Sequence, residues 1–120
     1  MPYSKPVKEF EDIIAWQKAQ ELVVIIYRIF RDSRDFGFRD QICRAAVSVS
    51  NNIAEGFERG SDPDFRRFLF MAKGSSGEVR SMAYAGKALG YLEPAQFQEI
   101  RDRSTEIGRI LGGFIKKLGK

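Results

Sequence analysis

The residue types that carry most enzyme chemistry are scarce in this sequence of 120 residues. It contains no histidine and a single cysteine, Cys43. The usual general base near neutral pH is therefore missing, as are the Ser-His and Cys-His nucleophile pairs and the commonest metal ligand. Cys43 follows Ile42 inside a helical pattern, which favours a small, semi-buried side chain over a nucleophile. We predict that the protein is not an enzyme and needs no cofactor and no metal ion.

One polar helix face could still support carboxylate chemistry. This polar face consists of Arg44, Ser48, Asn51, Asn52 and Glu55. Serine and asparagine are poor mid-helix residues because their side chains compete for backbone hydrogen bonds. A hydrogen-bonded network that fixes helix register or a subunit contact would explain their presence. RNA processing by a nuclease that uses Glu55 is the alternative, but metal-assisted phosphodiester cleavage usually needs several converging carboxylates, so the structural interpretation is preferred.

A row of cations occurs in the second half of the sequence. The first sixty residues carry nine Lys/Arg and nine Asp/Glu and the last sixty carry eleven and seven, so the whole net charge of +4 lies in the second half. Arg66, Lys73, Arg80 and Lys87 recur every seven residues and form what we call the basic row. This spacing keeps them on one side of a helix over roughly 31 Å. Arg66 has Asp62 four residues before it, whereas the other three have no acidic residue three or four positions away.

The sequence allows two interpretations of the basic row. Unpaired cations in a line suit a phosphate backbone, whose affinity comes from counterion release and depends steeply on salt. The same row is also explained by a solvated outer face, or by ion pairs with acids on a neighbouring helix. No aromatic residue alternates with these cations in a recognisable RNA-binding motif, so base-specific readout is not indicated. We predict non-specific binding of RNA or another nucleic acid, with an acidic protein as the alternative partner.

Helical periodicity assigns these residues to a bundle. Apolar residues recur at helical spacing in four segments, which turns rich in glycine and proline separate. No strand pattern is visible, and no apolar run approaches the roughly 20 residues that a membrane span needs. Short connections between four amphipathic helices predict an all-α fold, an antiparallel up-down-up-down four-helix bundle. The prediction comprises a flexible arm over residues 1–10 and one domain over residues 11–118, with helices at about 11–30, 38–58, 63–89 and 94–118.

Three further expectations follow from local composition. The segment Leu22–Tyr27 is apolar around the whole circumference of its helix, which indicates a second contact surface and hence an oligomer. Small residues fill the centre of the third helical segment and would allow another helix to approach closely, at the expense of local helix strength. They are Ala72, Gly74, Ser75, Ser76, Gly77, Ser81, Ala83, Ala85, Gly86 and Ala88. The segment Met1–Asp12 has no apolar signal core, so we expect a cytoplasmic protein that does not contact membranes.

Several motifs together resemble a known family. They include Ala15–Ala19 around Trp16, the segment Gln41–Gly56, and Arg59–Ser61 followed by Phe65. Phe68-Leu69 and Leu89–Leu92 extend the match to about residues 10–118. The sequence resembles the 23S rRNA intervening-sequence proteins, which are also labelled S23 ribosomal proteins. The residues that form its structural or interface signature are Trp16, Arg44, Asn51, Asn52, Glu55 and Gly56.

The resemblance implies a small antiparallel bundle that assembles as a ring-like homopentamer. Members of the family are encoded within bacterial 23S rRNA genes or elsewhere in genomes, and their biochemical role is not established. The related accessory variability proteins of diversity-generating retroelements form similar basic pentamers that bind nucleic acid and a reverse transcriptase. RNA, DNA, a reverse transcriptase or another protein are therefore the partners that the resemblance suggests.

Overall fold

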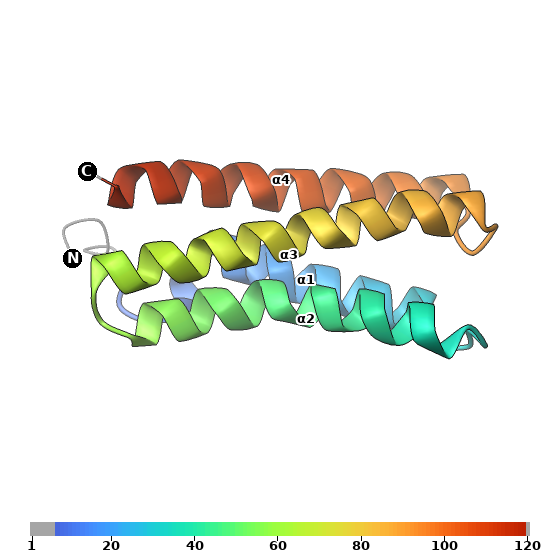
Figure 1. Ribbon diagram of the computed structural model, residues 1–120, viewed down its shortest axis with the longest axis horizontal. Helices are drawn as coiled ribbons and strands as arrows, with labels where there is room; N and C mark the ends of the chain where they lie inside the picture. The colour runs from blue at the N-terminus through green and yellow to red at the C-terminus, as the bar shows by residue number, and fades with distance from the viewer. Residues whose placement is uncertain (1–6, 120) are drawn as a thin grey trace.

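A computed structural model describes residues 7–119, and helices account for nearly all of them (Figure 1). Within this range there is no β-strand, and the long axis of the molecule measures 46 Å against 19 Å for each of the other two. The all-α four-helix bundle predicted from the sequence is confirmed. The elements in chain order are the 3-10 helix η2 (Phe10–Asp12) and the α-helices α1 (Ile14–Ile29), α2 (Phe36–Glu58), α3 (Asp62–Ala88) and α4 (Pro94–Leu118).

The helices alternate in direction, as short connections require. The α1–α2 and α3–α4 turns lie at one end of the bundle and the α2–α3 turn lies at the other (Figure 1). α3 packs against α2 and α4, and α1 packs against the same two helices. Gly60 and Gly90 end α2 and α3 with positive φ angles of 82° and 78°, which favour glycine. Asp35 and Ser61 cap the following helices by accepting hydrogen bonds from the backbone N–H groups three residues later.

The first helix begins later than the sequence indicates. Glu11 and Asp12 belong to the separate 3-10 turn η2, and α1 starts at Ile14 because Ile13 adopts an extended conformation (φ −77°, ψ 120°). The ring of Phe10 packs edge-on against Trp16, with 5.3 Å between the ring centroids. Most of the predicted arm, residues 1–6, lies outside the described residues.

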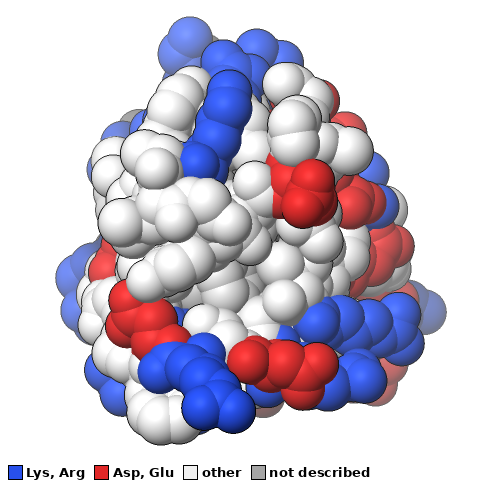
Figure 2. Space-filling view, turned by 90° about the vertical axis from the view of Figure 1, so that its right-hand side faces the viewer, with Lys and Arg blue, Asp and Glu red and all other residues white. Residues whose placement is uncertain are grey.

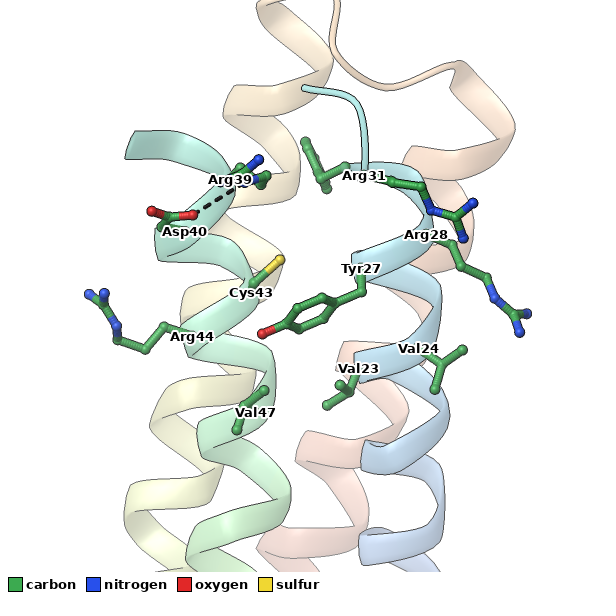
Figure 3. A pocket seen from close by; sticks show the side chains of 11 residues that line it. Val23, Val24, Tyr27, Arg28, Arg31, Arg39, Asp40, Cys43, Arg44 and Val47 are labelled. Carbon is green, nitrogen blue, oxygen red and sulfur yellow. Dashed lines mark hydrogen bonds and ion pairs between the residues drawn. The ribbon is translucent and has the colours of Figure 1, made fainter. Parts of the chain in front are cut away.

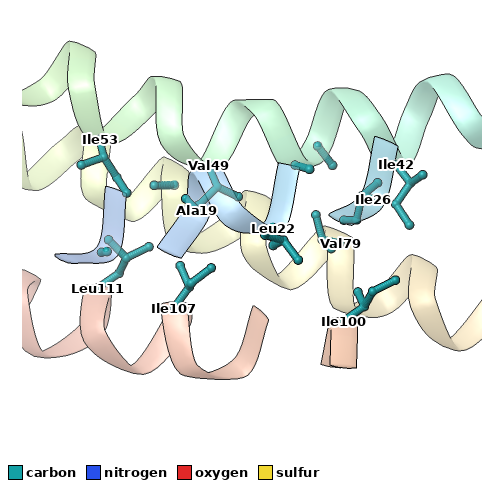
Figure 4. Close-up of a cluster of buried hydrophobic side chains, with 14 of the residues drawn as sticks. Ala19, Leu22, Ile26, Ile42, Val49, Ile53, Val79, Ile100, Ile107 and Leu111 are labelled. Atoms are coloured by element: carbon teal, nitrogen blue, oxygen red, sulfur yellow. The ribbon is translucent and has the colours of Figure 1, made fainter. Parts of the chain in front are cut away.

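The core is a column of aliphatic side chains from all four helices (Figure 4). Leu22 and Ile26 of α1, Ile53 of α2, Val79 of α3 and Ile107 of α4 are fully buried. Among the described residues, the buried polar side chains are three serines, and no charged side chain is buried. Burial of such aliphatic surface is the main driving force for the fold.

The glycines of α2 and α3 differ in whether a neighbouring helix lies close to them. A Cβ atom on Gly56 would lie 2.5 Å from the Cβ of Phe68, so glycine is required for α2 to approach α3. At Gly74 and Gly77, by contrast, an added Cβ would meet no atom within 4 Å. Close approach along the small residues of α3 is thus found at Ser75 and Ser76, which contact α2 and α4, and at Gly86, where an added Cβ would lie 3.4 Å from the Phe38 ring of α2. It is not found at Gly74 and Gly77, which face open space.

Candidate nucleic-acid interface

The basic row lies along the side of α3 that is directed toward α4. α3 is one uninterrupted helix from Asp62 to Ala88, so the four residues of the basic row, seven positions apart, lie on one side of it. Contacts from the row reach α4 at several levels of the bundle: Arg66 contacts the C-terminal part of α4, and Lys87 contacts its first turn. None of the four cations forms an ion pair with a described residue.

The two ends of the row are held against α4 by contacts that leave their charges uncompensated. The Nε of half-buried Arg66 donates to the carbonyl oxygen of Ile115 at 3.1 Å, and its guanidinium lies 5.1 Å from the centroid of the Phe70 ring. The Nζ of Lys87 lies 4.6 Å from the centroid of the Phe97 ring. Carbonyl and ring contacts orient a cation without neutralising it.

The centre of the row borders a groove between α3 and α4. Lys73 and Arg80 are exposed on the α3 wall, and the Nη1 of Arg80 donates to the Thr105 hydroxyl at 3.3 Å. Arg109 forms part of the α4 wall and has no ion pair with a described residue. The groove has a volume of about 630 Å³. Its glycines, which we call the floor of the α3–α4 groove, are Gly74, Gly77, Gly108 and Gly112.

The acidic residues of α4 explain why this side stays positive. Glu106 pairs with Lys18 of α1 at 3.3 Å, and Arg103 pairs with Glu21 of α1 at 3.0 Å. Arg103 also pairs with Glu99 within α4, at 3.2 Å. Asp102, the remaining acid of α4, pairs with Arg101, whose Nε donates to the Tyr84 hydroxyl of α3, but Asp102 does not line the groove. The α3–α4 groove is therefore without a carboxylate. The alternative that neighbouring acids neutralise the row does not hold for the described residues.

Sequence reasoning missed Arg109. Glu106 precedes Arg109 by three residues, a spacing at which helical ion pairs form. The structure directs Glu106 toward Lys18 instead. The excess of cations over acids in the second half of the chain indicated that some cations of α4 lack an acidic partner. The sequence could not show on which side of α4 each cation lies.

The end of the bundle that carries the α1–α2 and α3–α4 turns has an uneven distribution of charge (Figure 2). Uncharged side chains occupy its middle. Basic side chains gather along the upper edge, on the side where α4 lies in Figure 1, whereas acidic and basic side chains lie next to one another along the lower edge. The charge of the molecule is thus unevenly distributed around the bundle axis.

Part of the polar face of α2 forms a hydrogen-bonded network with α3. Half-buried Asn52 donates from Nδ2 to the carbonyl oxygen and the hydroxyl of Ser48, at 2.8 and 2.9 Å. The Ser48 hydroxyl also lies 2.9 Å from that of Ser75 on α3. On the other side of α2, Gln20 of α1 donates to buried Ser50 at 3.0 Å. These contacts connect α2 to both of its neighbours at the middle of the bundle.

The other members of the polar face lie apart from this network. Asn51 and Arg44 are exposed, and Glu55 is exposed and paired with Arg59 one turn later at 3.3 Å. Arg44 and Glu55 are not joined to each other. No three His, Cys, Asp or Glu residues within 7–119 come close enough together to hold a metal ion. The carboxylate alternative therefore gains no support from the geometry.

A second groove, between α1 and α2, has apolar walls and an arginine rim (Figure 3). Tyr27 of α1 points across it toward α2, with Val23, Val24 and Val47 nearby. Of the apolar segment Leu22–Tyr27, Leu22 and Ile26 are in the core, whereas Val24 and Tyr27 are 44% and 52% exposed. The arginines at the rim are Arg28, Arg31, Arg39 and Arg44.

Cys43 lies at the wall of the same groove and is buried. Burial raises the pKa of the Cys43 thiol, because the charged thiolate is disfavoured away from water. A thiol with a raised pKa is a weaker nucleophile at neutral pH, which agrees with a packing role.

The fold and the charge distribution define a four-helix bundle with a basic seam between α3 and α4. A family model described as 23S rRNA-intervening sequence protein matches residues 11–113, and the chain belongs to this family. A crystal structure of a protein of unknown function from the S23 ribosomal protein family of Bacteroides thetaiotaomicron VPI-5482 is 27% identical, with a TM-score of 0.80. The match covers 86% of this chain and 99% of that one. No curated protein matches the sequence. No helix within residues 7–119 has the length and apolar character needed to cross a bilayer.

Proposed function

We propose that the protein is a non-enzymatic helical bundle that binds nucleic acid without sequence specificity. The binding surface is the basic row, Arg66, Lys73, Arg80 and Lys87, together with Arg109. A line of fixed cations attracts the phosphate groups of a nucleic acid of any sequence, and the release of counterions from these phosphates supplies the affinity.

The observation that supports this proposal is the absence of compensating carboxylates in the α3–α4 groove. Exposed cations on most protein surfaces lie among acidic residues, as the ion pairs between α1 and α4 do here. At the α3–α4 seam the partners of the cations are a hydroxyl, a carbonyl group and aromatic rings. An unneutralised line of positive charge attracts a polyanion and steers its approach.

A salt series tests the proposal. Binding of labelled RNA and DNA to the full chain is measured by filter binding, and we expect the affinity to fall steeply as salt increases. The double variant Lys73→Glu/Arg80→Glu should abolish binding at moderate salt. Lys8→Glu/Arg34→Glu changes the net charge equally at two exposed positions that lie outside both grooves, so it should retain most of the affinity.

Two results would overturn the proposal. One is an affinity that does not respond to salt, and the other is an equal loss in both double variants, since this would reflect net charge alone. Capture of an acidic protein by the basic row, in a pull-down that survives nuclease treatment and is lost in Lys73→Glu/Arg80→Glu, would favour a protein-interaction scaffold instead.

A further inference from the structure

We infer that the α3–α4 groove accepts a single strand of nucleic acid rather than a duplex. In this arrangement Lys73, Arg80 and Arg109 contact the phosphates, and a base stacks on Phe70. The inference rests on the proposed nucleic-acid binding and specifies the kind of strand that the same surface recognises.

The cations lie on both walls of the groove. Lys73 and Arg80 are seven residues apart on α3, roughly 10 Å along the helix axis. Arg109 lines the same groove from α4. The stem of Lys73 lies over Gly112, since a Cβ at that glycine would be 3.6 Å from the Lys73 Cε. A strand in the groove would therefore meet positive charge from two sides, whereas a flat basic surface offers it from one.

An exposed aromatic ring lies in the wall of the groove. Phe70 is 51% exposed, although its neighbour Leu69 is fully buried. The guanidinium of Arg66 is placed over this ring, and Phe70 lines the groove together with Lys73. An exposed aromatic ring beside cations is the combination with which proteins hold single strands, because every unpaired base can stack on it. A duplex hides the faces of its bases and cannot use this ring.

The floor of the groove gives the shape that a single strand needs. An added Cβ at Gly74, Gly77 or Gly108 would meet no atom within 4 Å, so helix packing does not require glycine at these positions. Without side chains there, a furrow opens between the cationic walls. Packed helices have axes about 8–10 Å apart, so the furrow between them is too narrow for a double helix to enter. A single strand is narrower than a duplex, and its unpaired bases can turn out of the furrow onto an aromatic ring.

Filling the floor without changing the charge tests this inference. Gly77→Gln and Gly108→Gln each place an uncharged side chain in the groove and replace glycine by a better helix former. Fluorescence anisotropy with labelled oligouridine and with an RNA duplex of the same length gives the two affinities. We expect each variant to weaken oligouridine binding at least about tenfold and to leave duplex binding unchanged. Gly113→Gln is the matched control, because Gly113 is also open to solvent in α4 but does not line the groove.

The aromatic contact has its own matched pair of variants. Phe70→Ala should weaken oligouridine binding about tenfold, the size expected for the loss of one stacked base. Phe36→Ala should have no effect, although Phe36 is 59% exposed and also lies beneath an arginine, Arg39. Circular dichroism of each variant confirms that the helices are intact.

The outcomes separate this inference from the proposed function. If Lys73→Glu/Arg80→Glu abolishes binding but the glutamine variants and Phe70→Ala bind oligouridine as the unmodified protein does, the basic row binds nucleic acid and the groove does not accept a strand. Tighter binding of the duplex than of oligouridine would likewise overturn the inference. If neither ligand binds in a salt-dependent way, the proposed function fails as well.

Discussion

At the scale of single residues, glycine occurs in these helices for opposite physical reasons. Gly56 permits contact between α2 and α3, whereas Gly77 faces an open groove. Gly56→Ala should therefore lower the free energy of unfolding by about 1–3 kcal/mol, because the new methyl group overlaps Phe68. Gly77→Ala is the control and should raise it by about 0.5–1 kcal/mol, because alanine favours the helix and meets nothing. Urea denaturation measures both, and changes of the same sign would contradict the packing described here.

A second prediction at this scale concerns Asp35, which caps α2. The hydrogen bond from the Tyr91 hydroxyl, 2.7 Å long, and a second one from the Phe38 N–H hold the pKa of the Asp35 carboxyl below its ordinary value. A depressed pKa stabilises the folded state above the ordinary aspartate value of about 3.9, and this stabilisation is lost as the pH falls through the lower folded value.

Tyr91→Phe should therefore flatten the dependence of stability on pH in the acid range. The free energy of unfolding, measured by denaturation between neutral pH and strongly acidic pH, should fall less on acidification than it does in the unmodified protein. Tyr27→Phe is the control, because the Tyr27 hydroxyl has no hydrogen-bond partner among the described residues. An identical pH profile for Tyr91→Phe would show that the Asp35 contact contributes nothing in solution.

At the scale of helices, short polar side chains set how the elements align. The hydroxyls of Ser48 and Ser75 connect α2 to α3, and buried Ser76 donates to the carbonyl oxygen of Ser104 on α4 at 2.7 Å. An aliphatic core alone tolerates several alignments of adjacent helices, whereas a hydrogen bond between two of them is satisfied in one. Serine lowers the helix propensity of α2 and α3, and the hydrogen bonds between helices explain why serine nevertheless occurs there.

A double-mutant cycle tests this role of the serines. Ser48→Ala and Ser75→Ala should show a coupling energy of about 0.5–1.5 kcal/mol in the free energy of unfolding, as expected for a hydrogen bond between helices. Ser48→Ala combined with Ser81→Ala is the control pair, because Ser81 is exposed and the hydroxyl of α3 that contacts Ser48 is that of Ser75. Strict additivity in both pairs would mean that the hydroxyl contact does not stabilise the α2–α3 interface.

At the scale of the whole molecule, the apolar walls of the α1–α2 groove leave a surface that a monomer does not cover. We propose that this face of one copy packs against a different face of the next copy, as a closed ring requires, to form the pentamer that the family resemblance implies. The exposure of Val24 and Tyr27 beside the groove supports this proposal. Contiguous exposed apolar surface of this kind usually marks a protein interface.

Light scattering tests the association directly. The molar mass at micromolar concentration should exceed the 13.7 kDa of the single chain several times. Val24→Glu/Tyr27→Glu should reduce it to the chain mass, because a charged side chain is costly to bury in an interface. Leu89→Glu is the control, since Leu89 is 57% exposed at the end of α3 and lies outside this face. A monomer for the unmodified protein would refute the proposal.

The sequence by itself determined the four helices and their antiparallel order. Apolar residues at helical spacing and turn residues such as Gly60, Pro63 and Gly90 act locally, so their effect is visible without a structure. The start of α1 was misplaced by three residues, because the extended conformation of Ile13 and the packing of Phe10 on Trp16 are tertiary effects. The basic row was likewise predictable, since its spacing is a property of one helix.

The tertiary structure alone decided how that row is surrounded. Glu106 could neutralise Lys73 or Arg80 only if its side of α4 faced α3. The rotation of α4 about its own axis instead turns Glu106 toward α1, where it pairs with Lys18. The same rotation brings Arg109 to the groove, and no pattern within one helix encodes it. Glycine shows the same limit: Gly56 and Gly77 look alike in sequence, and only the neighbouring helix distinguishes a required contact from an open groove.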